Sequence, residues 1–119
     1  MQRVIENLVS NARDALRDDG RGRAGRIWLQ AYTHENQVVI RVADNGPGIL
    51  PEIRESLFVP YETAGKADGT GLGLAIAANI VEAHRGTLSA EEKPPEGGAA
   101  FRVALDRDQS FWEELVQTI

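Results

Sequence analysis

The sequence predicts an α+β fold in which helices cover one face of an antiparallel or mixed sheet, as a two-layer α/β sandwich. Two observations predict this class. Apolar residues recur at helical spacing in two long segments, and four shorter apolar runs are grouped in two pairs. The elements follow the order helix, two strands, helix, two strands, helix within 119 residues. A chain of this length forms one domain with a sizeable core.

The first half of the chain predicts a helix followed by a hairpin. Residues 2–17 form the helix, because their apolar positions recur three or four residues apart. The stretch 18–25, rich in glycine and arginine, ends this helix as a loop. Residues 26–33 and 37–43 are predicted as the two strands of a β-hairpin, with a short connection at 34–36.

The middle of the chain predicts a short helix, a loop and a long helix. Pro51 suits the first position of a short helix at 51–57. Residues 62–70 are polar, contain glycine and lack periodicity, so we expect a flexible flap there. The second long helix is predicted over 72–84, and Arg85-Gly86 is expected to form its C-cap.

The last part of the chain predicts another strand pair and a final helix. Residues 87–90 and 100–105 read as strands, separated by a Pro-Pro-Glu-Gly-Gly turn. The apolar spacing in 110–119 predicts a short helix. We therefore expect one domain over 1–108, with a helical extension over 109–119.

Composition excludes several classes of function. The net charge of −5 argues against a general nucleic-acid-binding surface. The absence of cysteine removes disulfides, thiol catalysis and cysteine-ligated metals. No apolar run approaches the roughly 20 residues that span a bilayer, so we expect no membrane segment within this chain.

Three glycines at alternate positions open the second long helix, in Gly69-Thr70-Gly71-Leu72-Gly73. Without side chains in the way, the N–H groups and the positive end of the helix dipole face a ligand, as in sites that bind phosphate. Glycines also serve ordinary turns, so this signal depends on its companions.

Two asparagines, Asn7 and Asn11, lie one turn apart on the same face of the first helix. Their amide oxygens suit a Mg²⁺ ion that also keeps phosphate oxygens and waters as ligands. The alternative is a pair of solvated asparagines on a helix surface. Asparagine is a poor helix former, and two in adjacent turns weigh against that alternative.

Asp44 follows an apolar strand and begins an Asp-Asn-Gly-Pro-Gly turn. The turn by itself is ordinary. A carboxylate at the end of a buried strand needs a partner, however, because an unpaired buried charge is costly. An exocyclic amine such as that of adenine would supply one.

Together these segments resemble the nucleotide-binding domain of the GHKL ATPase superfamily, most closely the catalytic (HATPase) domain of two-component sensor histidine kinases. Residues 7–12 resemble its asparagine box, 44–48 its first glycine box, 57–61 its phenylalanine box and 69–76 its second glycine box. The resemblance implies a Bergerat-type ATP-binding fold that takes ATP and Mg²⁺. The strand and helix that commonly precede the asparagine box in the family are not in this chain, so we expect an N-terminally truncated sheet with an exposed edge.

The resemblance also implies a role for each matching residue. Asp44 would accept a hydrogen bond from the adenine amine, and Asn11 with Asn7 would ligate Mg²⁺. Phe58 and Tyr61 would belong to a lid over ATP, on which Lys66 is either a phosphate contact or an ordinary surface lysine. The implied catalytic residues are Asn7, Asn11 and Lys66, and the implied nucleotide-binding residues are Asn11, Asp44, Gly46, Gly48, Ile49, Phe58, Tyr61, Gly69, Thr70, Gly71, Leu72 and Gly73.

One position separates the branches of the superfamily. Members that hydrolyse ATP carry a glutamate one turn before the metal-binding asparagine, and Asn7 occupies that place here. Glu6 lies about 100° around the helix and should not substitute for it. The resemblance therefore implies that ATP is held for transfer to a histidine imidazole. His34 and His84 do not fit the acceptor motif, so the phosphorylated histidine is expected outside this chain.

The implied partners are a histidine-containing dimerisation domain, missing from this chain, and a response regulator. The implied parent is a homodimer with this domain in the cytoplasm, and it is compatible with a membrane anchor. Two alternatives stay open. One is a GHKL-type serine kinase similar to the anti-sigma-factor kinases, and the other is a non-catalytic nucleotide-binding interaction module.

Overall fold

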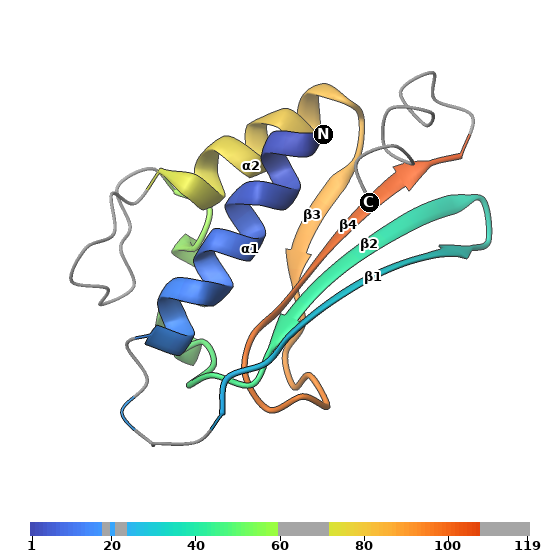
Figure 1. Cartoon of the computed structure of the whole chain (residues 1–119). Coiled ribbons are helices and arrows are strands. Elements are labelled where there is room, and N and C mark those ends of the chain that lie inside the picture. The colour runs from blue at the N-terminus through green and yellow to red at the C-terminus, as the bar shows by residue number, and fades with distance from the viewer. Residues whose placement is uncertain (18–19, 21–23, 60–71, 108–119) are drawn as a thin grey trace.

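The computed structural model describes residues 1–17, 20, 24–59 and 72–107 of the chain. In these residues, helices lie on one face of an antiparallel sheet (Figure 1), as the sequence predicts. The predicted flap at 62–70 and the predicted helix at 110–119 lie outside the described residues. The elements in chain order are α1 (Gln2–Arg17), β1 (Ile27–His34), β2 (Gln37–Asp44), the 3₁₀ helix η1 (Pro51–Ser56), α2 (Gly73–Ala83), β3 (Thr87–Ala90) and β4 (Ala100–Asp106).

The described strands form one four-stranded sheet in the order β1-β2-β4-β3, and each neighbouring pair is antiparallel. The predicted hairpin is confirmed, with His34 opposite Gln37 across a two-residue turn. The sequence did not predict that β4 inserts between β2 and β3. Its register places Ala100 opposite Ala43, so the segment before β4 runs beside the end of β2. This pairing brings Asp44 next to residues far along the chain.

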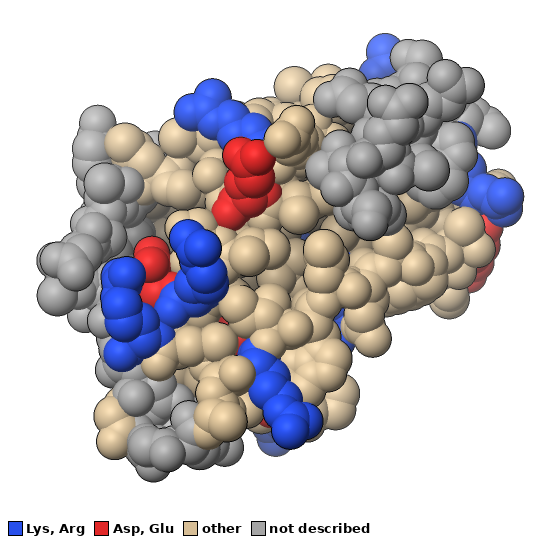
Figure 2. Space-filling view, viewed as in Figure 1, with Lys and Arg blue, Asp and Glu red and all other residues tan. Residues whose placement is uncertain are grey.

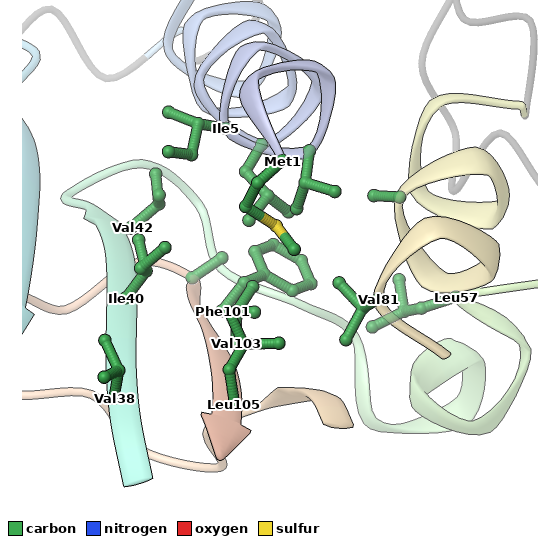
Figure 3. Packing of buried hydrophobic residues seen from close by; sticks show 14 residues of the cluster. Met1, Ile5, Val38, Ile40, Val42, Leu57, Val81, Phe101, Val103 and Leu105 are labelled. Carbon is green, nitrogen blue, oxygen red and sulfur yellow. The ribbon is translucent and has the colours of Figure 1, made fainter. Parts of the chain in front are cut away.

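The core lies between the helices and the face of the sheet that they cover (Figure 3). Alternate residues of the two central strands point toward the helices, because successive side chains of a strand face opposite sides. Burying these side chains removes apolar surface from water, which is the main force that holds the two layers together. The most deeply buried members are Val4, Leu8, Val38, Ile40, Val42, Ala77, Val81, Val103 and Leu105.

Helix α2 ends in a left-handed cap, as predicted, although the residue that carries the unusual backbone is Arg85. Its φ is 60°, and its N–H donates to the carbonyl of Glu82 over 2.9 Å. The N–H of Gly86 donates to the carbonyl of Val81, also over 2.9 Å. This pair of bonds is a Schellman motif. Gly86 is required for space: a β-carbon there would lie 2.8 Å from the carbonyl oxygen of Ala104.

Charged side chains of both signs are interspersed over a largely uncharged surface on the face shown in Figure 2. The pair Arg17–Asp14 on α1 spans 3.1 Å, with side chains 61% and 33% exposed. Pairs as exposed as this one contribute little stability. Among the described residues, no helix is long and apolar enough to cross a membrane.

Candidate functional site

Asp44 lies at the end of β2, on the face that the helices cover, and is 2% exposed. Its Oδ1 accepts hydrogen bonds from the N–H of Gly46 at 2.9 Å and the N–H of Ala99 at 3.2 Å. No described residue donates a hydrogen bond to its Oδ2. A buried carboxylate oxygen in this state is costly unless a ligand supplies a donor. The backbone thus fixes one oxygen and leaves the other suited to an amine.

Glycines allow the backbone to approach Asp44 closely. A β-carbon at Gly46 would lie 3.1 Å from the carboxylate, and Gly48 has a φ of 84°. The tightest position is Gly98, where a β-carbon would collide with Oδ1 of Asp44 and lie 2.5 Å from the nitrogen of Gly46. In the sequence, Gly98 reads only as part of a turn. Its role depends on the pairing of β2 with β4, which no local pattern indicates.

Asn45 supports the same turn from the other side. Its Oδ1 accepts from the N–H of Arg26 at 2.7 Å, and its Nδ2 donates to the carbonyl of Ala24 at 3.0 Å. These bonds attach the turn after Asp44 to the segment that enters β1. The sequence analysis did not single out Asn45. Asparagine beside glycine is typical of turns in general, so its local signal was not specific.

Asn7 connects α1 to the start of α2. Its Nδ2 donates to the carbonyl oxygen of Gly73 over 3.2 Å, and Asn11 follows one turn later on α1, also half-buried. The two helices lie side by side (Figure 1). The sequence-predicted asparagines and the last glycine of the glycine run therefore lie in one region. This hydrogen bond from the side-chain amide of Asn7 to Gly73 O also fixes the orientation of the Asn7 side chain.

Helix α2 begins at Gly73 without a side-chain cap. A β-carbon at Gly73 would meet nothing within 4 Å among the described residues. A helix start of this kind exposes N–H donors and the positive end of the dipole. Leu72 and Gly73 lie at this helix start, and their predicted contact with phosphates stays a prediction. Gly69, Thr70, Gly71, Tyr61 and Lys66 lie outside the described residues, and their assigned roles stay predictions.

Phe58 and Ile49 both pack against the core. The ring of Phe58 contacts that of Phe101 edge to face, with centroids 6.2 Å apart and planes at 72°. Phe58 therefore anchors the start of the expected lid segment to β4. Its predicted contact with the nucleotide stays a prediction, as does that of Ile49.

The described residues include no group of three or more His, Cys, Asp or Glu that could hold a metal ion. A magnesium ion at this site would depend on neutral amide oxygens such as those of Asn7 and Asn11, completed by phosphate oxygens and water. Magnesium favours such mixed oxygen sites, so the donor set fits the ion.

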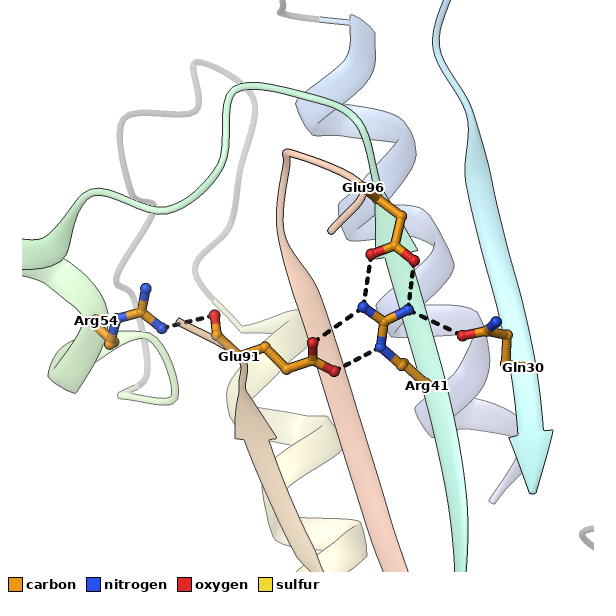
Figure 4. A network of polar contacts seen from close by, with 5 residues as sticks. All are labelled: Gln30, Arg41, Arg54, Glu91 and Glu96. Atoms are coloured by element: carbon orange, nitrogen blue, oxygen red, sulfur yellow. Dashed lines mark hydrogen bonds and ion pairs between the residues drawn. The ribbon is translucent and has the colours of Figure 1, made fainter. Parts of the chain in front are cut away.

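A cluster of charged residues lies on the face of the sheet opposite the helices (Figure 4). Arg41 of β2 is 7% exposed and contacts Glu91 and Glu96. Hydrogen bonds and charge attraction from these carboxylates raise the pKa of Arg41, and the bonds from Arg41 lower the pKa of Glu96. No local sequence pattern indicates this cluster, whose members come from β2 and from the segment between β3 and β4.

Known proteins with similar sequences include sensor proteins. The chain is 39% identical over 107 residues to the C4-dicarboxylate transport sensor protein DctB of Rhizobium meliloti, a match that covers 90% of this chain and 16% of that protein. It is 43% identical over 107 residues to the sensor histidine kinase ZraS of Salmonella typhi, covering 88% and 21% respectively. The chain therefore spans about a fifth or less of the length of these relatives.

A solved structure shows the same fold. The mycobacterial sensor histidine kinase MprB superimposes with a TM-score of 0.74 at 28% identity, over 87% of this chain and 70% of that one. The family model described as "Histidine kinase-, DNA gyrase B-, and HSP90-like ATPase" matches residues 1–109. Because this match covers nearly the whole chain, including the turn after Asp44 and the start of α2, the chain belongs to the family of histidine kinase-, DNA gyrase B- and HSP90-like ATPases.

Proposed function

We propose that this chain is the ATP-binding catalytic domain of a sensor histidine kinase, which donates the γ-phosphate of ATP to a histidine on a separate dimerisation domain. The observation that carries the proposal is Asp44, a buried carboxylate whose Oδ2 accepts no hydrogen bond from the described residues. In a chain of an ATPase family, such a group suits the amino group of adenine. The similarity to ZraS and MprB supports the kinase branch of that family.

Each end of the nucleotide has a matching region. Asp44 would accept from the adenine amine, while Gly46 and Gly98 let the backbone pass close to the carboxylate. The start of α2 at Leu72 and Gly73 would face the phosphates, with its N–H groups as donors. Magnesium, when bound, neutralises the phosphate charge and favours departure of ADP. Asn11 and Asn7 would hold that ion through their amide oxygens.

The identity of residue 7 supports transfer over hydrolysis, because Asn7 occupies the place where hydrolytic members of the superfamily carry a glutamate. An amide cannot accept a proton at neutral pH, and the Asn7 side chain is engaged with Gly73 O. Glu6 is exposed and accepts a hydrogen bond from Gln2 at 3.0 Å, on a different side of α1. A neutral histidine imidazole needs no such base, because its lone pair attacks the γ-phosphorus directly while the bond to the bridging oxygen breaks. Catalysis then consists mainly of positioning and charge neutralisation.

The partners follow from this reaction. The acceptor histidine would lie on a dimerisation domain of the parent protein, which we propose to be a homodimer with this domain in the cytoplasm. The phosphoryl group would pass from that histidine to a response regulator.

The test is phosphotransfer in trans. The chain is incubated with ATP labelled at the γ-phosphate, Mg²⁺ and a separately produced dimerisation domain from a related kinase, with an Asn11→Ala chain for comparison. We expect label on the dimerisation domain that is lost in acid, as phosphohistidine is, and that depends on Asn11. Acid-stable label would indicate a serine kinase instead. ATP binding without transfer to any histidine-bearing domain would favour a non-catalytic module.

A further inference from the structure

Arg41 joins three parts of the structure on the face of the sheet opposite the helices (Figure 4). Its Nε and Nη2 donate to Glu91 at 2.6 and 3.1 Å, and its Nη1 and Nη2 donate to Glu96 at 2.7 Å each. Nη1 also donates to Gln30 of β1 at 3.0 Å. Paired bonds from one guanidinium to two carboxylates fix direction as well as distance.

Glu91 and Glu96 belong to the same connection, residues 91–99, which joins β3 to β4. Arg54 of η1 contacts the same connection through the carbonyl oxygens of Glu91 at 3.0 Å and Glu92 at 3.3 Å. Arg41 and Arg54 thus attach this connection to β2 and to η1, the elements that flank the turn after Asp44. The connection is held at both of its ends.

The path from Glu96 to Asp44 is short. A turn closed by the bond from Gly97 N–H to the carbonyl of Pro94, at 3.1 Å, contains Glu96. Two residues later, Gly98 donates its N–H to the carbonyl of Asp44 at 3.1 Å, and Ala99 donates to Oδ1 at 3.2 Å. Arg41 and Asp44 are three positions apart on β2, so their side chains face opposite sides of the sheet. The connection therefore contacts β2 on both faces of the sheet, through Arg41 on one and Asp44 on the other.

We infer that the Arg41–Glu96 ion pair positions Gly98 and Ala99 against Asp44, and so sets the affinity for adenine without touching the nucleotide. The nucleotide part of this inference rests on the proposed function. The pair is largely removed from water, with the side chains of Arg41 and Glu96 exposed by 9% and 12%. In Glu96→Gln, Arg41 keeps its bonds to Glu91, but the new amide can accept only one of the two bonds that Glu96 accepts and no longer attracts the guanidinium charge, so the hold on this part of the connection weakens.

The test compares Glu96→Gln with wild type by two measurements, amide hydrogen exchange without nucleotide and ADP binding by calorimetry. We expect exchange at Gly98 and Ala99 to become at least about tenfold faster, with exchange in the centre of β4 at Val103 unchanged. We expect the dissociation constant for ADP to rise about five- to twentyfold, because the hydrogen bond from the adenine amine to the charged Asp44 carboxylate is misaligned. The second variant is Glu91→Gln. The Glu91 side chain is 25% exposed, so losing its carboxylate threatens folding less than losing that of Glu96.

The matched control is Gly86→Ala, which strains the opposite end of the sheet beside Leu105. It should lower the melting temperature while leaving ADP affinity and exchange at Gly98 unchanged. Unchanged exchange at Gly98 and Ala99 in Glu96→Gln overturns the inference, and so does ADP affinity within twofold of wild type. If wild type binds no ADP but these amides exchange faster in Glu96→Gln, the positioning role is supported and the proposed function is the part that fails.

Discussion

The N–H of Ala99 donates a hydrogen bond to Oδ1 of Asp44 although the two residues are 55 positions apart in the chain. The bond exists because β4 pairs with β2, which places the residue before β4 beside the end of β2. The site around Asp44 is therefore a product of sheet topology as much as of the Asp-Asn-Gly-Pro-Gly turn. Changes on either segment should affect it.

Replacing Gly98 by alanine should damage both the fold and the site. The new β-carbon would collide with Oδ1 of Asp44 and crowd its carbonyl oxygen at 2.5 Å, and backbone atoms cannot move aside cheaply. We expect a loss of about 1–3 kcal/mol in the free energy of unfolding. Urea denaturation measures this loss, and ADP titration should show at least about tenfold weaker binding. Wild-type stability and affinity would contradict the assigned contact.

Replacing Gly73 by alanine should affect phosphates but not the fold. A β-carbon there meets nothing within 4 Å among the described residues, and alanine favours helices, so stability should stay equal or rise by up to about 1 kcal/mol. The methyl group would, however, stand beside the N–H groups that we propose to bind the phosphates. We expect weaker binding of MgATP and unchanged binding of adenosine, measured by parallel titrations. An equal loss for both ligands would argue against phosphates at this helix start.

Replacing Gly86 by alanine should destabilise the fold without affecting nucleotide binding. The added β-carbon would lie 2.5 Å from Cδ2 of Leu105 and 2.8 Å from the carbonyl oxygen of Ala104. Overpacking of this kind costs about 1–3 kcal/mol, which thermal unfolding followed by circular dichroism would detect. Gly73→Ala is the comparison, since its β-carbon meets nothing within 4 Å among the described residues. A Gly86→Ala chain as stable as wild type would contradict this prediction and show that β4 can shift away from the added β-carbon at Ala104 and Leu105.

Stability should depend on acid pH through Glu96. The bonds from Arg41 hold the pKa of Glu96 below its ordinary value of 4.5 in the folded chain. This contribution is present above the ordinary pKa and is lost as the pH falls through the folded-state pKa, because the unfolded chain takes up the proton first. We expect the free energy of unfolding to fall less steeply with acid in Glu96→Gln than in wild type. Parallel slopes in urea denaturation at several pH values would contradict this role.

Much of the fold follows from local patterns. The helical periodicity of α1 and α2, and the two short runs joined by a connection at 34–36, predicted the helices and the hairpin that the structure confirms. Asp44 was also identified, since a carboxylate after an apolar strand is conspicuous in the sequence. These features need only a few neighbouring residues to be read.

The contacts missed by the sequence analysis depend on residues distant in the chain. Gly98 looks like any turn glycine until β4 is placed beside β2. The partners of Arg41 lie 50 and 55 positions away, so an arginine in a strand gives no sign that it will be buried. Asn45 likewise depends on the segment that enters β1. Long-range strand pairing is what the local patterns do not contain.

The most direct test of the account is an ATP titration of wild type, Asp44→Asn and Asp106→Asn by calorimetry, with and without Mg²⁺. Asp106 is exposed and lies opposite Gln37, at the other end of β2 from Asp44, so it matches the substitution without touching the site. We predict that wild type and Asp106→Asn bind alike, and that Asp44→Asn loses at least about tenfold in affinity, as expected for a bond to a charged group. Equal ATP affinity in Asp44→Asn and wild type would contradict the assignment of Asp44 to the adenine site.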